Sequence, residues 1–111
     1  MIISTTDHVE GYRVVSVKGL VRGATVRARH LGRDVLASFR NLAGGEVLEY
    51  TKMLAEAREQ AIDRLIEEAE ALGADAVIGF RFQTSTIMRG AAEMLAYGTA
   101  VKLEKLEGSD S

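Results

Sequence analysis

The residues best suited to bind a metal ion are the two histidines of the chain, His8 and His30. Carboxylates lie near them in the sequence, at Asp7, Glu10 and Asp34. A soft heavy-metal site requires thiolates or several imidazoles, and the chain contains no cysteine. One chain therefore cannot supply a closed site of that kind, and we interpret both histidines as exposed loop residues. The alternatives are a ring that gathers copies of His8 around its axis, or a hard cation on the carboxylates. No cofactor is evident.

A second candidate site is the glycine pair Gly44-Gly45, which precedes a predicted long helix. Glycines let backbone N–H groups approach an anion, and the N-terminal end of a helix adds a favourable dipole. The stretch lacks the lysine of a P-loop and the spacing of a dinucleotide fingerprint. Glu46 and Glu49 also place negative charge there, which suits helix capping. We therefore predict a tight turn, with phosphate binding as the alternative.

Basic residues gather in one stretch of the sequence, which contains Arg22, Arg27, Arg29, His30 and Arg33. Proteins that bind single-stranded nucleic acid interleave such charges with aromatic stacking platforms. This stretch contains no aromatic residue. We interpret it as a charged strand edge that resists mispairing, and we expect no nucleic-acid partner.

Four further polar residues, Tyr50, Arg58, Arg81 and Tyr97, are of types that favour binding surfaces. Tyr50 and Arg58 lie eight residues apart, which is about two helical turns, and so share one side of a helix. Tyr and Arg are enriched at subunit interfaces, so we interpret all four as contact residues between subunits. The alternative is an inter-subunit pocket for a small anion. Its candidate ligand-binding residues are then Gly44, Gly45, Tyr50, Arg58, Arg81 and Tyr97.

Catalysis is not indicated by any motif in the chain. The serines, among them Ser4, Ser16, Ser38 and Ser85, lack the Gly-X-Ser-X-Gly context of a nucleophile elbow. The densest carboxylates fall on the outer face of a predicted helix, where nothing would raise a pKa for general-acid work. We therefore predict a protein that is not an enzyme.

Length and composition set the broad class. A chain of 111 residues corresponds to one domain, which we place at residues 1–106, followed by a loose tail at 107–111. The net charge of −2 attracts neither nucleic acid nor an acidic membrane. The first residues do not resemble a signal peptide, and no apolar run approaches the roughly 20 residues that cross a bilayer. We expect a cytoplasmic protein without a membrane partner.

Hydrophobic periodicity predicts the elements of the first two thirds of the chain. A short strand is possible at residues 2–5, and the β-branched run 12–28 is expected to form two strand segments, with Gly19 and Gly23 as bends or bulges. Asp34 is suited to cap a short helix that runs to about residue 40. A long amphipathic helix is predicted over residues 48–72, and Gly73 follows it as the left-handed C-terminal glycine.

Two strands are predicted after the helix, at residues 76–86 and 93–106, joined through Gly90. A helix between two strands favours a right-handed crossover that leaves those strands parallel. The last strand then lies between them and antiparallel to both. The predicted fold class is α+β: a two-layer β-α-β-β subunit with one long helix on a small mixed sheet.

Alternation along the strands assigns side chains to the two faces of this sheet. Ile78, Phe80 and Phe82 are predicted to face one way, with Arg81 and Gln83 facing the other. Along the last strand, one face is predicted to carry Leu95, Tyr97, Thr99, Val101 and Leu103. The opposite face is expected to hold Val77, Met94, Ala96 and Ala100, and so is not wholly polar. One helix cannot cover both faces, and another copy of the chain is the simplest cover.

Several segments resemble the YbjQ-like family, whose members are also described as carrying a heavy-metal-binding domain. The strongest match is Gly73-Ala74-Asp75-Ala76-Val77-Ile78-Gly79, and others are Arg40-Asn41-Leu42-Ala43-Gly44-Gly45-Glu46, Tyr50 with Ala57-Arg58, and Gly98-Thr99-Ala100-Val101. Many members have Arg where this chain has Glu46. The resemblance implies a dodecin-like subunit that assembles as a ring, usually a homopentamer.

Overall fold

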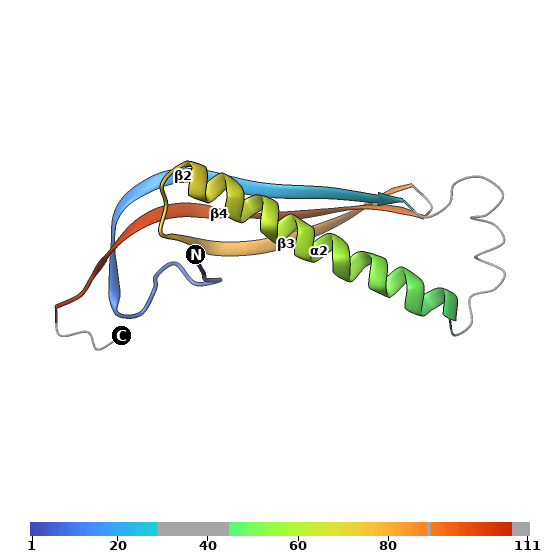
Figure 1. Cartoon of the computed structure of the whole chain (residues 1–111), viewed down its shortest axis with the longest axis horizontal. Coiled ribbons are helices and arrows are strands. Elements are labelled where there is room, and N and C mark those ends of the chain that lie inside the picture. Colours follow the sequence, from blue (N-terminus) through green and yellow to red (C-terminus); the bar gives the residue numbers. More distant parts are fainter. Residues whose placement is uncertain (29–44, 89, 108–111) are drawn as a thin grey trace.

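The computed structural model describes residues 1–28, 45–88 and 90–107, and its strands form one sheet (Figure 1). The strands are β1 (Ile2–Ile3), β2 (Tyr12–Ala28), β3 (Ala76–Met88) and β4 (Ala91–Lys105). Their order across the sheet is β1-β3-β4-β2. β4 lies between β2 and β3 and is antiparallel to both, as predicted. The sheet has a fourth strand because β1 adds to the β3 edge in parallel.

The run from Tyr12 to Ala28 is one continuous strand, so the prediction of two segments is wrong. Two irregularities in its pairing with β4, between Val14 and Ser16 and between Val17 and Gly19, let this long strand bend without a break. Gly19 lies at the second of them with a φ of 125°, as expected for a bulge glycine.

The helix α2 (Gly45–Ala71) is longer than predicted at its N-terminal end. Its buried stripe is made of Ala57, Ala61, Leu65 and Ala69, each fully inaccessible to solvent. The left-handed Gly73 ends it as predicted, with a φ of 74°. Figure 1 shows α2 lying across the sheet over β2 and β4, while its first turns diverge from the strands. The predicted helix at residues 34–40 lies outside the described residues.

The helix packs closely on the sheet because the residues between them are small. A Cβ at Gly23 would lie 2.1 Å from the carbonyl oxygen of Ala61 and 2.6 Å from the backbone nitrogen of Leu65. Gly23 is therefore a packing position and not the predicted bend. Thr25, on the same strand, donates a buried hydrogen bond from Oγ1 to the carbonyl of Ala57 at 3.0 Å.

The face covered by α2 is the small-residue face, which is the reverse of the expected arrangement. The core cluster joins Val21, Val77, Ala96 and Ala100 to the alanines of α2 and Leu65. Small side chains allow the helix to approach the sheet, whereas the larger residues of β4 would hold it away. The face that was expected to need a second cover is thus already covered by the helix.

A bulge in β3 overturns another predicted face assignment. Pairing with β4 shifts between Ile78 and Arg81, at Gly79, whose φ is 62°. Ile78 therefore faces the same way as Arg81, while Phe80 packs toward the core. Phe80 and Phe82 meet edge to face with ring centroids 5.1 Å apart. The prediction that Ile78 shares a face with both phenylalanines is wrong.

No helix in the described part of the chain is long and apolar enough to cross a membrane.

Candidate functional site

The face of the sheet opposite α2, called the open face below, displays rows of side chains that run across β2, β4 and β3. The pairing registers define these rows as Leu20–Thr99–Ile78, Arg22–Tyr97–Arg81, Ala24–Leu95–Gln83 and Val26–Glu93–Ser85. Successive rows lie about 7 Å apart, since they are two residues apart along each strand. No described helix or strand covers this face, because α2 packs on the other one.

Apolar side chains on the open face are strongly exposed. Leu20 is 62% accessible and Val26 is 58% accessible, and Val17, which pairs with Val101 at the end of the same face, is 66% accessible. Single exposed apolar residues are ordinary on protein surfaces, but these three follow one face of one strand. Leu95 and Tyr97, beside them on β4, are half-buried. The face therefore has the composition of a contact surface.

Two arginines flank Tyr97 on this face. Arg22 pairs with Tyr97 from β2, and Arg81 pairs with it from β3. The guanidinium group of Arg81 is held at the edge of the sheet, where Nη1 donates to the carbonyls of Thr5 and Phe80, both at 2.8 Å. Arg22 is exposed and has no hydrogen bond or ion pair to any described residue. Its guanidinium group therefore has hydrogen-bond donors that no described residue uses.

The predicted ligand-binding residues are only partly brought together. Arg81 and Tyr97 are neighbours in one row of the open face. Arg58 is exposed on α2, in the other layer, and does not join them. Gly45 begins α2 and Tyr50 lies in its first turns, but the side chain of Tyr50 and all of Gly44 lie outside the described part. The predicted phosphate cradle is therefore untested.

Arg22 was predicted as part of a basic strand edge, and the structure divides that cluster. Arg22 faces the open side, whereas Arg27 lies on the helix side and donates to Oε1 of Gln60. The Nε atom of Arg27 is buried without a partner among the described residues. The other members of the cluster, Arg29, His30 and Arg33, lie outside the described residues. The register of β2 against β4 places Arg22 beside Tyr97, and only knowledge of that register could have predicted their proximity.

In the described part of the chain, the candidate metal ligands form a pair and no larger group. Nδ1 of His8 lies 3.0 Å from Oδ1 of Asp7, and both side chains are well exposed. This hydrogen bond, with the charge of a protonated His8, holds the pKa of Asp7 below its usual value. Among the described residues, no three His, Cys, Asp or Glu side chains lie together as metal ligands. Glu10 is exposed, and His30 and Asp34 lie outside the described residues.

Asp75 stabilises the start of β3 and is the other carboxylate with a clear pKa shift. Its Oδ2 accepts a hydrogen bond from the backbone N–H of Leu103 at 2.8 Å, and its Oδ1 accepts one from Nζ of Lys102 at 3.2 Å. These bonds lower the pKa of Asp75, with the bond from Leu103 as the larger cause. Both clear shifts in the described part are downward, whereas general-acid catalysis by a carboxyl group requires an upward shift.

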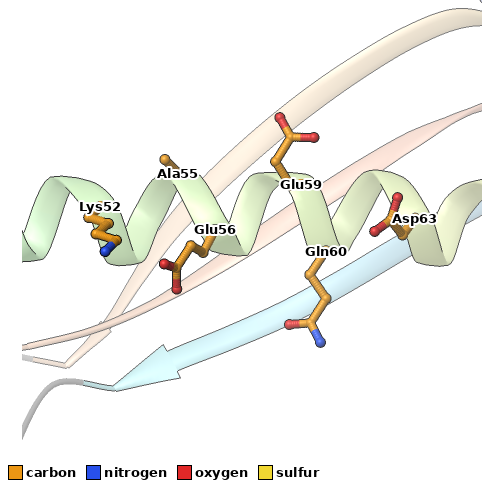
Figure 2. Close-up of a pocket in the computed structure, with 6 residues that line it drawn as sticks. All are labelled: Lys52, Ala55, Glu56, Glu59, Gln60 and Asp63. Carbon is orange, nitrogen blue, oxygen red and sulfur yellow. The ribbon is translucent and has the colours of Figure 1, made fainter.

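The outer surface of α2 carries more acidic than basic side chains, and six of its residues line a shallow pocket (Figure 2). A pocket of about 460 Å³ is lined by Lys52, Ala55, Glu56, Glu59, Gln60 and Asp63. Glu56, Glu59 and Asp63 are exposed and form no ion pair with another described residue. Farther along the helix the exposed residues Glu67, Glu68 and Glu70 continue the same charge. The exposed surface of α2 therefore has an excess of carboxylates, although Lys52, Arg58 and Arg64 are exposed there too, and the open face of the sheet is basic and apolar.

Comparison with known proteins identifies relatives over nearly the whole chain. The profile of a family described as "Putative heavy-metal-binding", of the YbjQ type, matches residues 1–104. A UPF0145 protein of Thermotoga maritima is 63% identical over 106 residues, which cover 96% of this chain and all of the relative. A UPF0145 protein of Clostridioides difficile is 60% identical, over 94% of this chain and 93% of its own length.

A solved structure shares the fold. It is a crystal structure of a protein of unknown function from Pediococcus pentosaceus, assigned to the DUF74 family. The TM-score is 0.60 at 18% sequence identity, and the match covers 94% of this chain and 98% of the other. At that identity the likeness shows the arrangement of one helix on a mixed sheet.

Proposed function

We propose that this chain, which belongs to the YbjQ-type family described as "Putative heavy-metal-binding" and has relatives named UPF0145 proteins, works as a homo-oligomer assembled through the open face. The observation that carries the proposal is the line of exposed apolar side chains on β2, at Val17, Leu20 and Val26. Removing such side chains from water is worth roughly 25 cal/mol for each Å² buried. A second copy of the same chain is the simplest partner that could cover these side chains.

The sheet edges support the same proposal. β2 pairs only with β4, so the outer edge of this 17-residue strand meets no other described strand. β1 pairs with β3 only at Ala76 and Val77, and chain after β1 hydrogen-bonds as far as Phe80. The rest of β3 carries exposed apolar residues, including Ile87 and Met88. Long unpaired edges of this kind invite pairing with another chain. We include in this proposal that the oligomer closes as a ring, for which the family resemblance implies a homopentamer.

The role proposed for the assembly is not enzymatic: a scaffold, or a module that binds a small ligand between subunits. Thr6 and Ser4 carry described hydroxyl groups that contact His8, but both donate to its backbone carbonyl, Oγ1 of Thr6 at 2.7 Å and Oγ of Ser4 at 3.4 Å, and not to the ring. Oγ of Ser4 also shares a hydrogen bond with Oγ1 of Thr6 at 2.6 Å and accepts one from the backbone N–H of Thr6 at 3.1 Å. This arrangement gives no base to activate Ser4 as a nucleophile.

Native mass spectrometry and multi-angle light scattering of the untagged protein test the proposal. We expect a single multimer at micromolar concentration, and a Leu20→Asp variant shifted to smaller species, since a charge would be buried in the interface. Leu106→Asp is the matched control, because Leu106 is also exposed, at 46%, but follows the last strand. A parent protein that is monomeric at these concentrations would rule out the proposal.

Metal binding is the second candidate function, and the His8–Asp7 contact is the observation that favours it. Two ligands from each copy form a competent site only where several copies converge. Metal analysis of the purified oligomer, parent against His8→Ala, tests this. Metal retained by the parent and lost by the variant supports the site. Equal metal content in both proteins shows that His8 is not a ligand.

A further inference from the structure

We propose that the surface seated on the open face is the acidic outer surface of α2 from a second copy, so that each contact joins a sheet face to a helix face. This inference rests on the self-assembly proposed above and specifies its geometry. The positive side of the contact is Arg22, in its row with Tyr97, and the negative side is the pocket lined by Glu56, Glu59 and Asp63.

Charge on the open face selects the occupant. Arg22 is exposed without a described partner, and Arg81 lies two strands away in the same row, about 10 Å distant along the sheet. Two open faces stacked directly would therefore oppose arginines to arginines. The carboxylate of Glu93 lies two rows away, about 13 Å along β4, and is half-buried. A surface that carries accessible carboxylates can form ion pairs with Arg22 more favourably than a second open face can.

The outer surface of α2 supplies those carboxylates without a change of fold. Glu59 and Asp63 lie four residues apart on the helix and so project from one side, and neither is neutralised by a described cation. Figure 2 shows them along the same stretch of α2 as Glu56 and Lys52. Complementary charge of this kind fixes the orientation of a contact and disfavours wrong ones.

The helix surface also offers apolar area to the exposed side chains of the open face. Ala55 lines the pocket, and Ile62, one helical repeat of seven residues farther on, lies on the same side of α2. Both are half-buried in the single chain. A strip of Ala55 and Ile62 beside Glu59 and Asp63 matches a face where Leu20 and Val26 flank Arg22.

A contact between two different surfaces has a consequence for the assembly. Each copy then has one sheet face to offer and one helix face to offer, so copies add head to tail. Such heterologous contacts form a ring when the rotation closes and a filament when it does not. A face-to-face contact would instead end at a two-fold dimer. The closed ring of the preceding proposal requires the head-to-tail arrangement, together with a rotation that closes.

Charge reversal on each surface tests the inference with the full chain. The variants are Arg22→Glu on the sheet, Glu59→Lys with Asp63→Lys on the helix, and all three together. Sedimentation velocity and light scattering measure assembly across a concentration series, and far-UV circular dichroism confirms the fold. We expect each reversal alone to weaken association at least about tenfold, and the combined variant to recover most of that loss. Lys18→Glu, on the same strand with the same charge change, is the control.

The remaining outcomes separate this inference from the proposal beneath it. A parent protein that is monomeric would contradict both the proposed self-assembly and the sheet-to-helix contact. A parent that assembles, together with a helix variant that assembles equally well, overturns the sheet-to-helix contact and leaves self-assembly standing. Rescue of Arg22→Glu by Glu93→Lys would also overturn it, in favour of a face-to-face dimer. A combined variant that stays dissociated while both single-surface variants fold shows that these charges do not meet.

Discussion

The two faces of the sheet differ in the size of their side chains, and this difference decides where the helix packs. On the helix side, Gly23, Ala96 and Ala100 leave room for the backbone of α2 itself. On the open side, Leu20, Arg22 and Tyr97 hold any neighbour a full side-chain length away. The small-residue face thus forms the core of one subunit, and the large-residue face is suited to contacts with something outside it.

The comparison also separates two kinds of apolar residue. Leu65 is fully buried against the sheet, whereas Leu20 is 62% accessible although it lies in the centre of a strand. A leucine in the core of one chain and a leucine on its exposed face, where we propose that it contributes to association, cannot be told apart in the sequence. Substitutions on the two faces of the sheet distinguish these roles.

Leu65→Ala should be the most destabilising single change. Truncation of a fully buried leucine leaves a cavity and costs about 3 kcal/mol of unfolding free energy. Leu20→Ala on the open face should cost less than about 0.5 kcal/mol in the isolated subunit. Urea unfolding at low protein concentration measures both. Equal losses would contradict the assignment of the two faces.

Gly23→Ala tests the close approach of the helix. The new Cβ would meet backbone atoms of Ala61 and Leu65, which cannot rotate away, so α2 must shift. We expect a loss of about 2 kcal/mol from this overpacking. Ala24→Val, the neighbouring residue on the open face, is the control and should change stability by less than about 0.5 kcal/mol. A neutral Gly23→Ala would show that the helix does not rest on this strand.

Thr25→Val removes the buried hydrogen bond from Oγ1 to the carbonyl of Ala57 while it keeps the shape of the side chain. The expected cost is about 1 kcal/mol, part of it from the unsatisfied carbonyl. Thr99→Val provides the matched change on the open face, where Thr99 is half-buried, and should have a smaller effect. Thermal unfolding of the two variants against the parent decides the point.

The smallest effect is the pH dependence conferred by Asp75. Its pKa in the folded protein is lowered from the ordinary value of 3.8, so its stabilising contribution is complete above that value. The contribution is lost as the pH falls through the lowered, folded-state pKa. The melting temperature of the parent should therefore exceed that of Asp75→Asn at neutral pH, and the gap should close in acid. A gap that is unchanged at about pH 2 would show that the carboxylate charge is not its source.

Much of the architecture was predictable because it depends on local pattern. The three-and-four spacing of Ala57, Ala61, Leu65 and Ala69 is sufficient to identify the long helix and its buried side. Gly73 marked its end through the left-handed conformation that glycine adopts readily. The parallel relation of the strands on either side of β4 followed from the handedness of a helical crossover.

The candidate site was less predictable, because bulges change which residues share a face. One extra residue at Gly79 reverses the alternation along β3, so that Ile78 and Phe82 face opposite ways. The bulges of β2 similarly decide which residues of that strand lie beside Tyr97, and so place Arg22 there. Alternation counted along the sequence carries no information about a bulge unless its position is known.

The sequence by itself determined the elements, their order and the family, since these follow from hydrophobic period, glycine conformation and local similarity. Only the tertiary structure decided which face of the sheet the helix covers. That choice depends on how closely two backbones approach, and so on the match between small side chains such as Gly23 and Ala61 that lie far apart in the chain. The same choice left Leu20, Arg22 and Tyr97 on the outside, because a single helix covers one face of a sheet.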